Sequence, residues 1–329
     1  MINENISKKI LYWYDNNKRI LPWRKKLSKK QKEYFTLVSE FMLQQTQVKT
    51  VIPYFINFTT KIPNLNRLAK VNDELLMKCW EGLGYYSRAR NLKKTAIKIF
   101  KEFKGRLPST MYELKSLPGI GDYTSRAIMA IAFNKKIIPL DGNVERILKR
   151  VFYLRRENEI SKEYLNNKKF FFGTSNRSSD YAQAIMEIGA LICKSNNPLC
   201  LQCPISKNCI SFKKKDFEIK SKNKLSKTKY FEAKIYQKNN KYLLINNNKF
   251  SFLKNMPIFP MTEIEEKKYK FSNNKKINVK LSNMDMKIIL NKIDKFPNIK
   301  NKILLEKKNT KLKILPSFTK KIFSSIHKI

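Results

Sequence analysis

Two acidic residues lie where a carboxyl group could perform acid–base or electrostatic chemistry. Glu40 lies inside an apolar helical segment, residues 38–43. Partial desolvation there would raise its pKa and let it hold a proton near neutral pH, as a general acid requires. Asp141 follows the apolar residues 137–140 and precedes Gly142; kept ionised, it could stabilise positive charge on a substrate. The alternatives are a solvated glutamate on a polar stripe and an aspartate that only caps the following helix.

Four cysteines form a second candidate site, with the spacing Cys193-x6-Cys200-x2-Cys203-x5-Cys209. Four thiolates this close in sequence can converge on one metal centre, either an iron–sulfur cluster or zinc. Zinc ribbons usually carry two C-x2-C pairs, whereas this chain has one, which favours iron and sulfur. The single histidine, His327, lies at the extreme C-terminal end, so Ser-His-Asp and Cys-His catalysis are not expected.

A short glycine-containing turn, Leu117-Pro118-Gly119-Ile120-Gly121, separates two segments with helical periodicity. Two glycines around one apolar residue allow backbone N–H groups to point outward, and the dipole of the next helix adds positive potential. This combination predicts a clamp for a phosphate group. The alternative is an ordinary turn between helices.

The elements that position these residues change character along the chain. From Ile6 to about Ile210, apolar residues recur at helical spacing, and residues 110–113 fit a capping box. Residues 213–229 are lysine-rich and predict a linker. Beyond them, alternation over 231–235 and an apolar run at 242–245 predict strands, whereas a segment around 284–293 predicts a helix. We therefore expect a mainly α N-terminal domain, 1–212, and a smaller α+β domain, 230–329.

The formal net charge is +43. A polyanionic partner is the leading explanation, because lysines that displace counterions from phosphates contribute to binding, and nucleic acid is favoured over a membrane. Part of the charge reflects a chain-wide bias toward lysine. The apolar runs are too short to cross a bilayer and no leader pattern is evident, so we expect a cytoplasmic protein.

Six segments together resemble the adenine DNA glycosylases of the MutY family, within the endonuclease III superfamily. The similarity covers the first 210 residues, and the segments occur in the family's order: Leu21-Pro22-Trp23-Arg24, the Glu40 segment, residues 80–90, the hairpin, residues 140–144 and the four cysteines. The resemblance implies a helix-hairpin-helix glycosylase domain with a 4Fe-4S cluster. It also implies base-excision repair on double-stranded DNA, by removal of adenine paired with 8-oxoguanine or guanine, in a nucleoid-associated monomer.

The same resemblance implies roles for individual residues. Glu40 would protonate the departing adenine, Asp141 would stabilise the oxocarbenium ion, Tyr123 would support that intermediate, and Asn143 would help to place water. Tyr123 stands where the lyases of the superfamily carry a Schiff-base lysine, which implies a monofunctional hydrolase. Gln44 and Tyr85 match the residues that wedge into the duplex, and Gly119 and Gly121 match the phosphate clamp. The adenine pocket would be formed by Leu21, Trp23, Arg24 and Gln183.

The C-terminal region is less similar to the family. Residues 252–260 resemble an early strand and turn of its Nudix-like lesion-recognition domain, and Phe318-Thr319-Lys320 replaces a loop that ends in histidine. Lys320 could donate to the lesion or be an ordinary surface lysine. The alternatives for the whole chain are an endonuclease III-like glycosylase with lyase activity and a DNA-binding module without catalysis.

Overall fold

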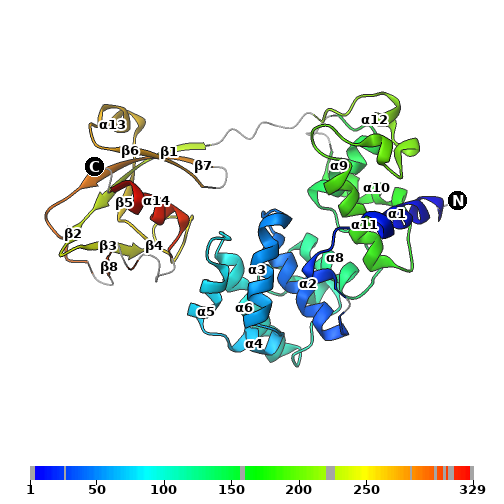
Figure 1. Ribbon diagram of the computed structural model, residues 1–329, viewed down its shortest axis with the longest axis horizontal. Coiled ribbons are helices and arrows are strands. Elements are labelled where there is room, and N and C mark those ends of the chain that lie inside the picture. The colour runs from blue at the N-terminus through cyan, green and yellow to red at the C-terminus, as the bar shows by residue number, and fades with distance from the viewer. Residues whose placement is uncertain are drawn as a thin grey trace. The chain divides into compact units, whose positions relative to one another are not determined.

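The computed structural model describes residues 4–25, 27–155, 160–219, 227–281, 284–299, 302–306, 309 and 315–326. Contacts divide the chain into two units. The first comprises Met1–Asn72 and Ser87–Lys222, and the second comprises Asp73–Tyr86 and Asn223–Ile329. Figure 1 labels the elements of both units.

The first unit is helical. Its described elements are α1 (Glu4–Asn17), η1 (Pro22–Arg24), α2 (Lys29–Leu43), α3 (Val48–Lys61), α4 (Leu65–Lys70), α6 (Ser87–Glu102), α7 (Met111–Lys115), α8 (Asp122–Ile131), α9 (Gly142–Val151), α10 (Lys162–Lys168), η3 (Lys169–Phe172), α11 (Ser178–Leu191), η4 (Cys200–Gln202), η5 (Ser206–Asn208) and α12 (Ile210–Lys213).

Helix α2 lies at the centre of one half of this unit. It starts at a capping box in which the Ser28 hydroxyl accepts from the Gln31 N–H while the Gln31 side chain accepts from the Ser28 N–H. Residues 36–42 are all buried, because α2 packs against α3, α6 and α8. A polar side chain in that stretch is therefore held in an apolar environment.

Helix α11 connects the other half of the unit to α8. It packs against α1, α8 and α9. Ile10, Ile147 and Ile185 belong to the apolar core that α1, α9 and α11 share, and Cys193, Cys203 and Cys209 border that core. The cysteine loop is thus anchored to the same helices that carry residues 141–146 and 183–189.

The second unit contains two small sheets and three helices among its described residues. One sheet has the order β5 (Met261–Ile264), β1 (Lys227–Ile235), β7 (Met284–Lys292) and β6 (Lys276–Leu281), with β1 and β7 parallel. The other joins β2 (Gln237–Lys238), β3 (Lys241–Asn246) and β4 (Pro257–Ile258), and β8 (Ile303–Glu306) pairs with β3. The helices are α5 (Asp73–Trp80), α13 (Glu266–Phe271) and α14 (Ser317–Ile326).

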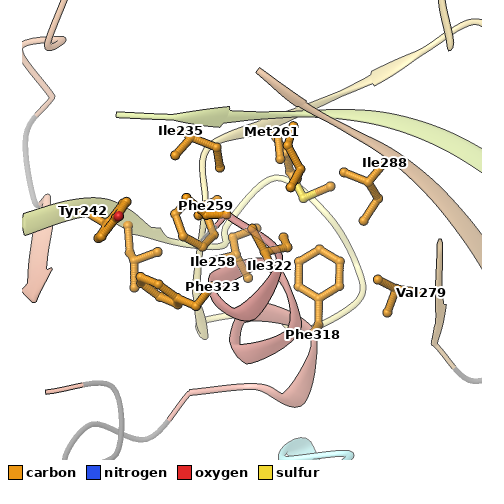
Figure 2. Close-up of a cluster of buried hydrophobic side chains, with 14 of the residues drawn as sticks. Ile235, Tyr242, Ile258, Phe259, Met261, Val279, Ile288, Phe318, Ile322 and Phe323 are labelled. Atoms are coloured by element: carbon orange, nitrogen blue, oxygen red, sulfur yellow. The ribbon is translucent and has the colours of Figure 1, made fainter. Parts of the chain in front are cut away.

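Helix α14 completes the core of this unit. Figure 2 shows Phe318, Ile322 and Phe323 of this helix directed toward apolar side chains of the strands, including Ile288 of β7. The Phe323 ring lies 4.8 Å from the Phe259 ring, centroid to centroid. The amphipathic helix therefore buries its apolar face against the sheets.

The helical prediction for residues 6–210 and the strands at 231–235 and 242–245 are confirmed. Of the capping box predicted at Thr110, the N-cap is confirmed, because the Thr110 hydroxyl accepts from the Glu113 N–H at 3.3 Å; the Glu113 carboxylate accepts from the Thr110 hydroxyl at 2.6 Å rather than from the Thr110 N–H. The helix expected around 284–293 is wrong, because Met284–Lys292 forms strand β7. Its apolar run pairs with β1 on one side and β6 on the other, and a short buried run does not distinguish helix from strand by periodicity. No helix in the described ranges is both long and apolar enough to cross a membrane.

Candidate active site

Glu40 is a buried carboxyl group in the middle of α2, with 5% of its surface exposed. Burial raises its pKa to about 7; the Asp141 carboxylate also raises it, whereas a hydrogen bond from Tyr123 and the charge of Arg24 oppose the increase. Its Oε2 atom has no hydrogen-bond partner among the described residues. Glu40 can therefore hold a proton near neutral pH, and one of its oxygens has hydrogen-bonding capacity that no described protein group uses.

Tyr123 lies in the first turn of α8, immediately after the glycine hairpin. Burial raises its pKa well above the ordinary value, and the negative charges of Glu40 and Asp141 raise it further. Its hydroxyl hydrogen-bonds to Glu40. Tyr123 consequently remains a neutral hydroxyl group between two carboxyl groups.

Asp141 is the N-cap of α9. Its Oδ1 atom accepts from the Val144 N–H at 2.7 Å, and its Oδ2 atom accepts from Asn143 Nδ2 at 3.0 Å. Burial raises the pKa of Asp141, and the donors from Val144 and Asn143 oppose that increase by stabilising the ionised form. The capping interpretation is confirmed, and the same geometry fixes the carboxylate beside Tyr123 and Glu40.

Arg146 and Gly189 hold the Asn143 side chain in position. Arg146 Nη2 donates to Asn143 Oδ1 and to the Gly189 carbonyl oxygen, both at 2.8 Å, and Arg146 Nε donates to the Cys193 carbonyl oxygen at 2.7 Å. A Cβ atom on Gly189 would lie 2.5 Å from Asn143 Cβ. Close packing and hydrogen bonds thus connect Asp141 to the start of the cysteine loop.

The charge of Arg24 is held near Glu40 by a residue that the sequence analysis missed. Glu187 of α11 is only 1% exposed, and it accepts from Arg24 Nη1 and, through both of its oxygens, from Arg19, all at 2.8 Å. Burial alone would raise the pKa of Glu187, but the hydrogen bonds and charges of both arginines lower it. The sequence did contain a signal for Glu187, because it is an acidic residue in an apolar helix, as Glu40 is.

The other predicted adenine-pocket residues lie on two elements, η1 with its N-cap and α11. Leu21 is buried, and Trp23 packs edge-on against Phe55 with ring centroids 5.1 Å apart. Gln183 of α11 is buried, and its Nε2 atom donates to the Ser179 carbonyl oxygen at 3.1 Å. Gln183 precedes Glu187 by one helical turn and therefore lies on the same face of α11.

The predicted hairpin lies between α7 and α8. Gly119 is exposed with a φ of +80°, and an added Cβ atom would lie 2.9 Å from Asn91 Cβ and 2.9 Å from Phe41 Cε1. Gln44 Nε2 lies 3.3 Å from the Gly119 carbonyl oxygen. An added Cβ at Gly121 would meet nothing within 4 Å, so only Gly119 is required by sterics.

The two predicted wedge residues lie in turns. Gln44 ends α2, and its carbonyl oxygen accepts from Arg88, whose guanidinium also donates to the carbonyl oxygen of Met42 at 2.7 Å. Tyr85 is 40% exposed with a φ of +48°, next to Gly84 with a φ of +76°. Gln44 belongs to the first unit and Tyr85 to the second.

The four predicted metal-ligating cysteines line one small cavity. Arg150 borders the same cavity, and its Nη1 atom lies 3.4 Å from Cys193 Sγ. Among the described residues, no three His, Cys, Asp or Glu side chains are arranged to hold a single metal ion. The fold thus brings the four cysteine side chains to one cavity.

The three residues predicted to recognise the lesion lie in the first turn of α14. Phe318 is buried in the core of the second unit, and the buried Thr319 hydroxyl donates to the Pro257 carbonyl oxygen at 2.8 Å. Lys320 is exposed, and its Nζ atom lies 2.6 Å from Glu81 Oε1. Of the three side chains, Lys320 alone is directed to the surface.

Comparisons with known proteins agree on one family. A model described as "HhH-GPD superfamily base excision DNA repair protein" matches residues 38–170. The chain is 35% identical to the adenine DNA glycosylase of Buchnera aphidicola subsp. Baizongia pistaciae, over 97% of this chain and 96% of that protein. It is 41% identical to the human adenine DNA glycosylase, over 61% of this chain and 38% of that protein.

Solved structures share the fold of the helical part. A thermostable thymine-DNA glycosylase matches with a TM-score of 0.57 and 25% identity, over 64% of this chain and 97% of that one. An endonuclease III in a non-covalent complex with DNA matches with a TM-score of 0.53 and 21% identity, over 65% of this chain and 98% of that one.

Proposed function

The chain belongs to the adenine DNA glycosylase family, and from this premise we propose that it hydrolyses the N-glycosidic bond of adenine paired with 8-oxoguanine or guanine in double-stranded DNA. The observation that carries the catalytic part is the buried cluster of Glu40, Tyr123 and Asp141. Two carboxyl groups whose environments differ are the requirement for acid-assisted departure of a base from a sugar.

In the proposed reaction, neutral Glu40 donates its proton to the five-membered ring of an extruded adenine. Its unpartnered oxygen supports this assignment, because a proton donor needs access to the base. The Asp141 carboxylate stabilises the oxocarbenium ion, held in place by the Val144 N–H and by Asn143. Tyr123 donates a hydrogen bond within the cluster, and Asn143 helps to place the attacking water.

Recognition of the mispair is assigned to residues around this cluster. Arg24, Leu21, Trp23 and Gln183 would contact adenine, Gln44 and Tyr85 would enter the duplex, and the Gly119–Gly121 hairpin would bind a backbone phosphate. Insertion of a side chain offsets part of the few kcal/mol lost when a base leaves the stack. The net charge of +43 supports a duplex DNA partner.

We assign a 4Fe-4S cluster to Cys193, Cys200, Cys203 and Cys209. The donor set fits, because iron–sulfur clusters bind four cysteine thiolates and these four side chains line one cavity. The bound cluster would supply a redox-active crosslink of this loop. The protein's own contribution is the Arg146 contact with the Cys193 carbonyl oxygen, which positions Asn143.

The reaction is proposed to be monofunctional. A tyrosine hydroxyl at position 123 cannot form the Schiff base through which lyases of the superfamily cut the strand. Borohydride reduction during turnover tests this point, because efficient covalent trapping on DNA would indicate the endonuclease III-like alternative.

We propose a division into a catalytic domain, 1–212, a linker, 213–229, and a Nudix-like lesion-recognition domain, 230–329. Lys320 is the exposed candidate for contact with 8-oxoguanine, since Phe318 and Thr319 are buried. A monomer acting on the nucleoid in the cytoplasm completes the proposal.

The decisive experiment is single-turnover excision from an adenine:8-oxoguanine duplex, comparing wild type with Glu40→Gln. The matched control is Glu33→Gln on the same helix, whose partly buried side chain lies outside the cluster. We expect Glu40→Gln to lose at least 100-fold in rate, in line with general acid catalysis, and the control to retain it. Equal rates would remove Glu40 from the mechanism, and DNA binding without excision by wild type would favour a non-catalytic module.

A further inference from the structure

The first unit contains a second cavity, of about 230 Å³, that no role above uses. Arg126, Lys136 and Lys169 line it, together with hydroxyl-bearing residues of the segment 174–178. Among the described residues, no acidic side chain lines it. Three cations and several hydroxyl groups around one cavity form a surface suited to an anion.

Lys169 is placed where its ammonium group could bind a negatively charged ligand. Its Nζ atom donates to the Ile138 carbonyl oxygen at 2.8 Å, which leaves further N–H donors on the same ammonium group. Burial and, to a smaller extent, the positive charge of Arg126 lower the pKa of Lys169 to about 8, against the opposing effect of Asp122. The negative charge of an anion in the cavity would oppose both effects by stabilising the charged ammonium group.

The walls of the cavity are fixed by hydrogen bonds between two loops. Asn134 Nδ2 donates to the Asn176 carbonyl oxygen at 3.0 Å, and Asn134 Oδ1 accepts from the Ser179 N–H at 2.8 Å. Gly173, with a φ of +64°, ends η3 at the cavity wall. The basic side chains therefore surround a cavity whose walls are held together by hydrogen bonds.

The cavity lies close to the catalytic cluster along two elements. Arg126 follows Tyr123 by one turn of α8, which is a rise of about 4.5 Å. Lining residues 137 and 138 lie on the segment that leads into Asp141. Along α8, the glycine hairpin, the catalytic hydroxyl and the basic cavity therefore follow one another within two turns.

We propose that this cavity binds a backbone phosphate of the DNA that flanks the extruded nucleotide. The inference rests on the proposed function, since it places DNA across α8. A phosphate oxygen would accept from Lys169, from Lys136 and from the terminal nitrogens of Arg126, whose Nε donates to Asp122 at 2.9 Å. The hydroxyl groups of Thr174 and Ser175 would complete the site, since the Ser178 hydroxyl already donates to the Ser175 carbonyl oxygen. The phosphate would hold the strand beside Tyr123 without reading its sequence.

The test measures binding of an undamaged duplex to the full-length protein over a range of salt concentrations. Binding of this duplex requires no excision, so its outcome is separate from that of the glycosylase proposal. We expect Lys169→Gln to lower the slope of log K against log salt by about 1, and Lys169→Arg to preserve it. Lys135→Gln is the matched control, because this exposed lysine is the sequence neighbour of the lining residue Lys136 but does not itself line the cavity.

A second arm distinguishes DNA from a free anion. Inorganic phosphate is titrated into the protein while the Lys169 side-chain signal is followed by NMR, and occupancy is expected to raise the pKa of Lys169 by about 1 or more. A phosphate response with no change in the DNA salt slope would overturn the assignment to DNA. An unchanged slope in Lys169→Gln, or an equal loss in Lys135→Gln, would do the same. If Lys169→Gln fails to fold, the exposed Lys136→Gln carries the comparison.

Discussion

The pKa of Glu40 makes excision depend on pH in a direction that can be tested. With a pKa of about 7, the protonated fraction of Glu40 is about nine-tenths at pH 6 and about one-tenth at pH 8. If the neutral acid protonates adenine, the single-turnover rate should fall about tenfold between these two pH values. At lower pH, protonation of Asp141 should reduce the rate again. The two apparent pKa values of the resulting bell-shaped rate profile then belong to the coupled pair of carboxyl groups rather than to either residue alone.

The same pKa shift predicts an effect on stability. Because the folded protein binds the Glu40 proton more tightly than the unfolded chain, the resulting stability is present below pH about 4.5 and is lost as pH rises through 7. The change from the ordinary value of 4.5 to about 7 corresponds to about 3 kcal/mol in the free energy of unfolding. Glu40→Gln cannot ionise and should lack this component.

Both effects are measured with one pair of proteins. Excision is followed with enzyme in excess over duplex, with DNA binding determined at each pH so that affinity does not distort the rate. Urea unfolding of wild type and Glu40→Gln at pH 4.5, 6 and 8 gives the stability difference. A flat rate between pH 6 and 8, together with parallel stability curves for the two proteins, would refute the assignment of Glu40 as a buried acid.

Three further substitutions test the supports of the site. Glu187→Gln should destabilise the fold by about 3 kcal/mol, because two arginines lose their buried anionic partner. The charge of Arg24 near Glu40 would then be uncompensated and would lower the pKa of Glu40, so the loss of excision rate with rising pH should begin at a lower pH. Gly189→Ala should cost about 1–3 kcal/mol by urea unfolding and slow excision, because its Cβ atom meets Asn143, whereas Gly142→Ala, with open space, should match wild type in stability. Gly119→Ala should weaken duplex binding in a fluorescence titration, since its positive φ and its neighbours oppose a side chain; Gly121→Ala is the control, and equal binding by both variants would exclude a steric requirement at the hairpin.

Local signals were sufficient for the parts of the fold that are determined locally. The Thr110 and Asp141 N-caps depend on residues within one helical turn, so the sequence alone predicts them. The strand at 284–292 was missed because one of its pairing partners, β1, lies far away in the chain, although the other, β6, is the strand that directly precedes it. Residues 288–290 form a buried apolar run whose structure is decided by those neighbours rather than by its own periodicity.

The support behind Asp141 could not be predicted for the same reason. Arg146 is a basic residue on an amphipathic helix and would ordinarily be assigned to the solvent. Its acceptors at Gly189 and Cys193 are more than forty residues distant along the chain. Only the packing of α11 against α9 makes it a positioning residue for Asn143.

Glu40 and Glu187 show where sequence reasoning reaches its physical limit. Each is an acidic residue inside an apolar helix, so the two share one sequence signal, and the structure buries both almost fully. Both oxygens of Glu187 accept from arginines, and its pKa falls; Glu40 keeps one oxygen without a partner, and its pKa rises to about 7. The same sequence signal therefore yields an ionised, arginine-bound carboxylate in one helix and a carboxyl group that can hold a proton near neutral pH in another, and the difference lies in the partners that the tertiary fold supplies.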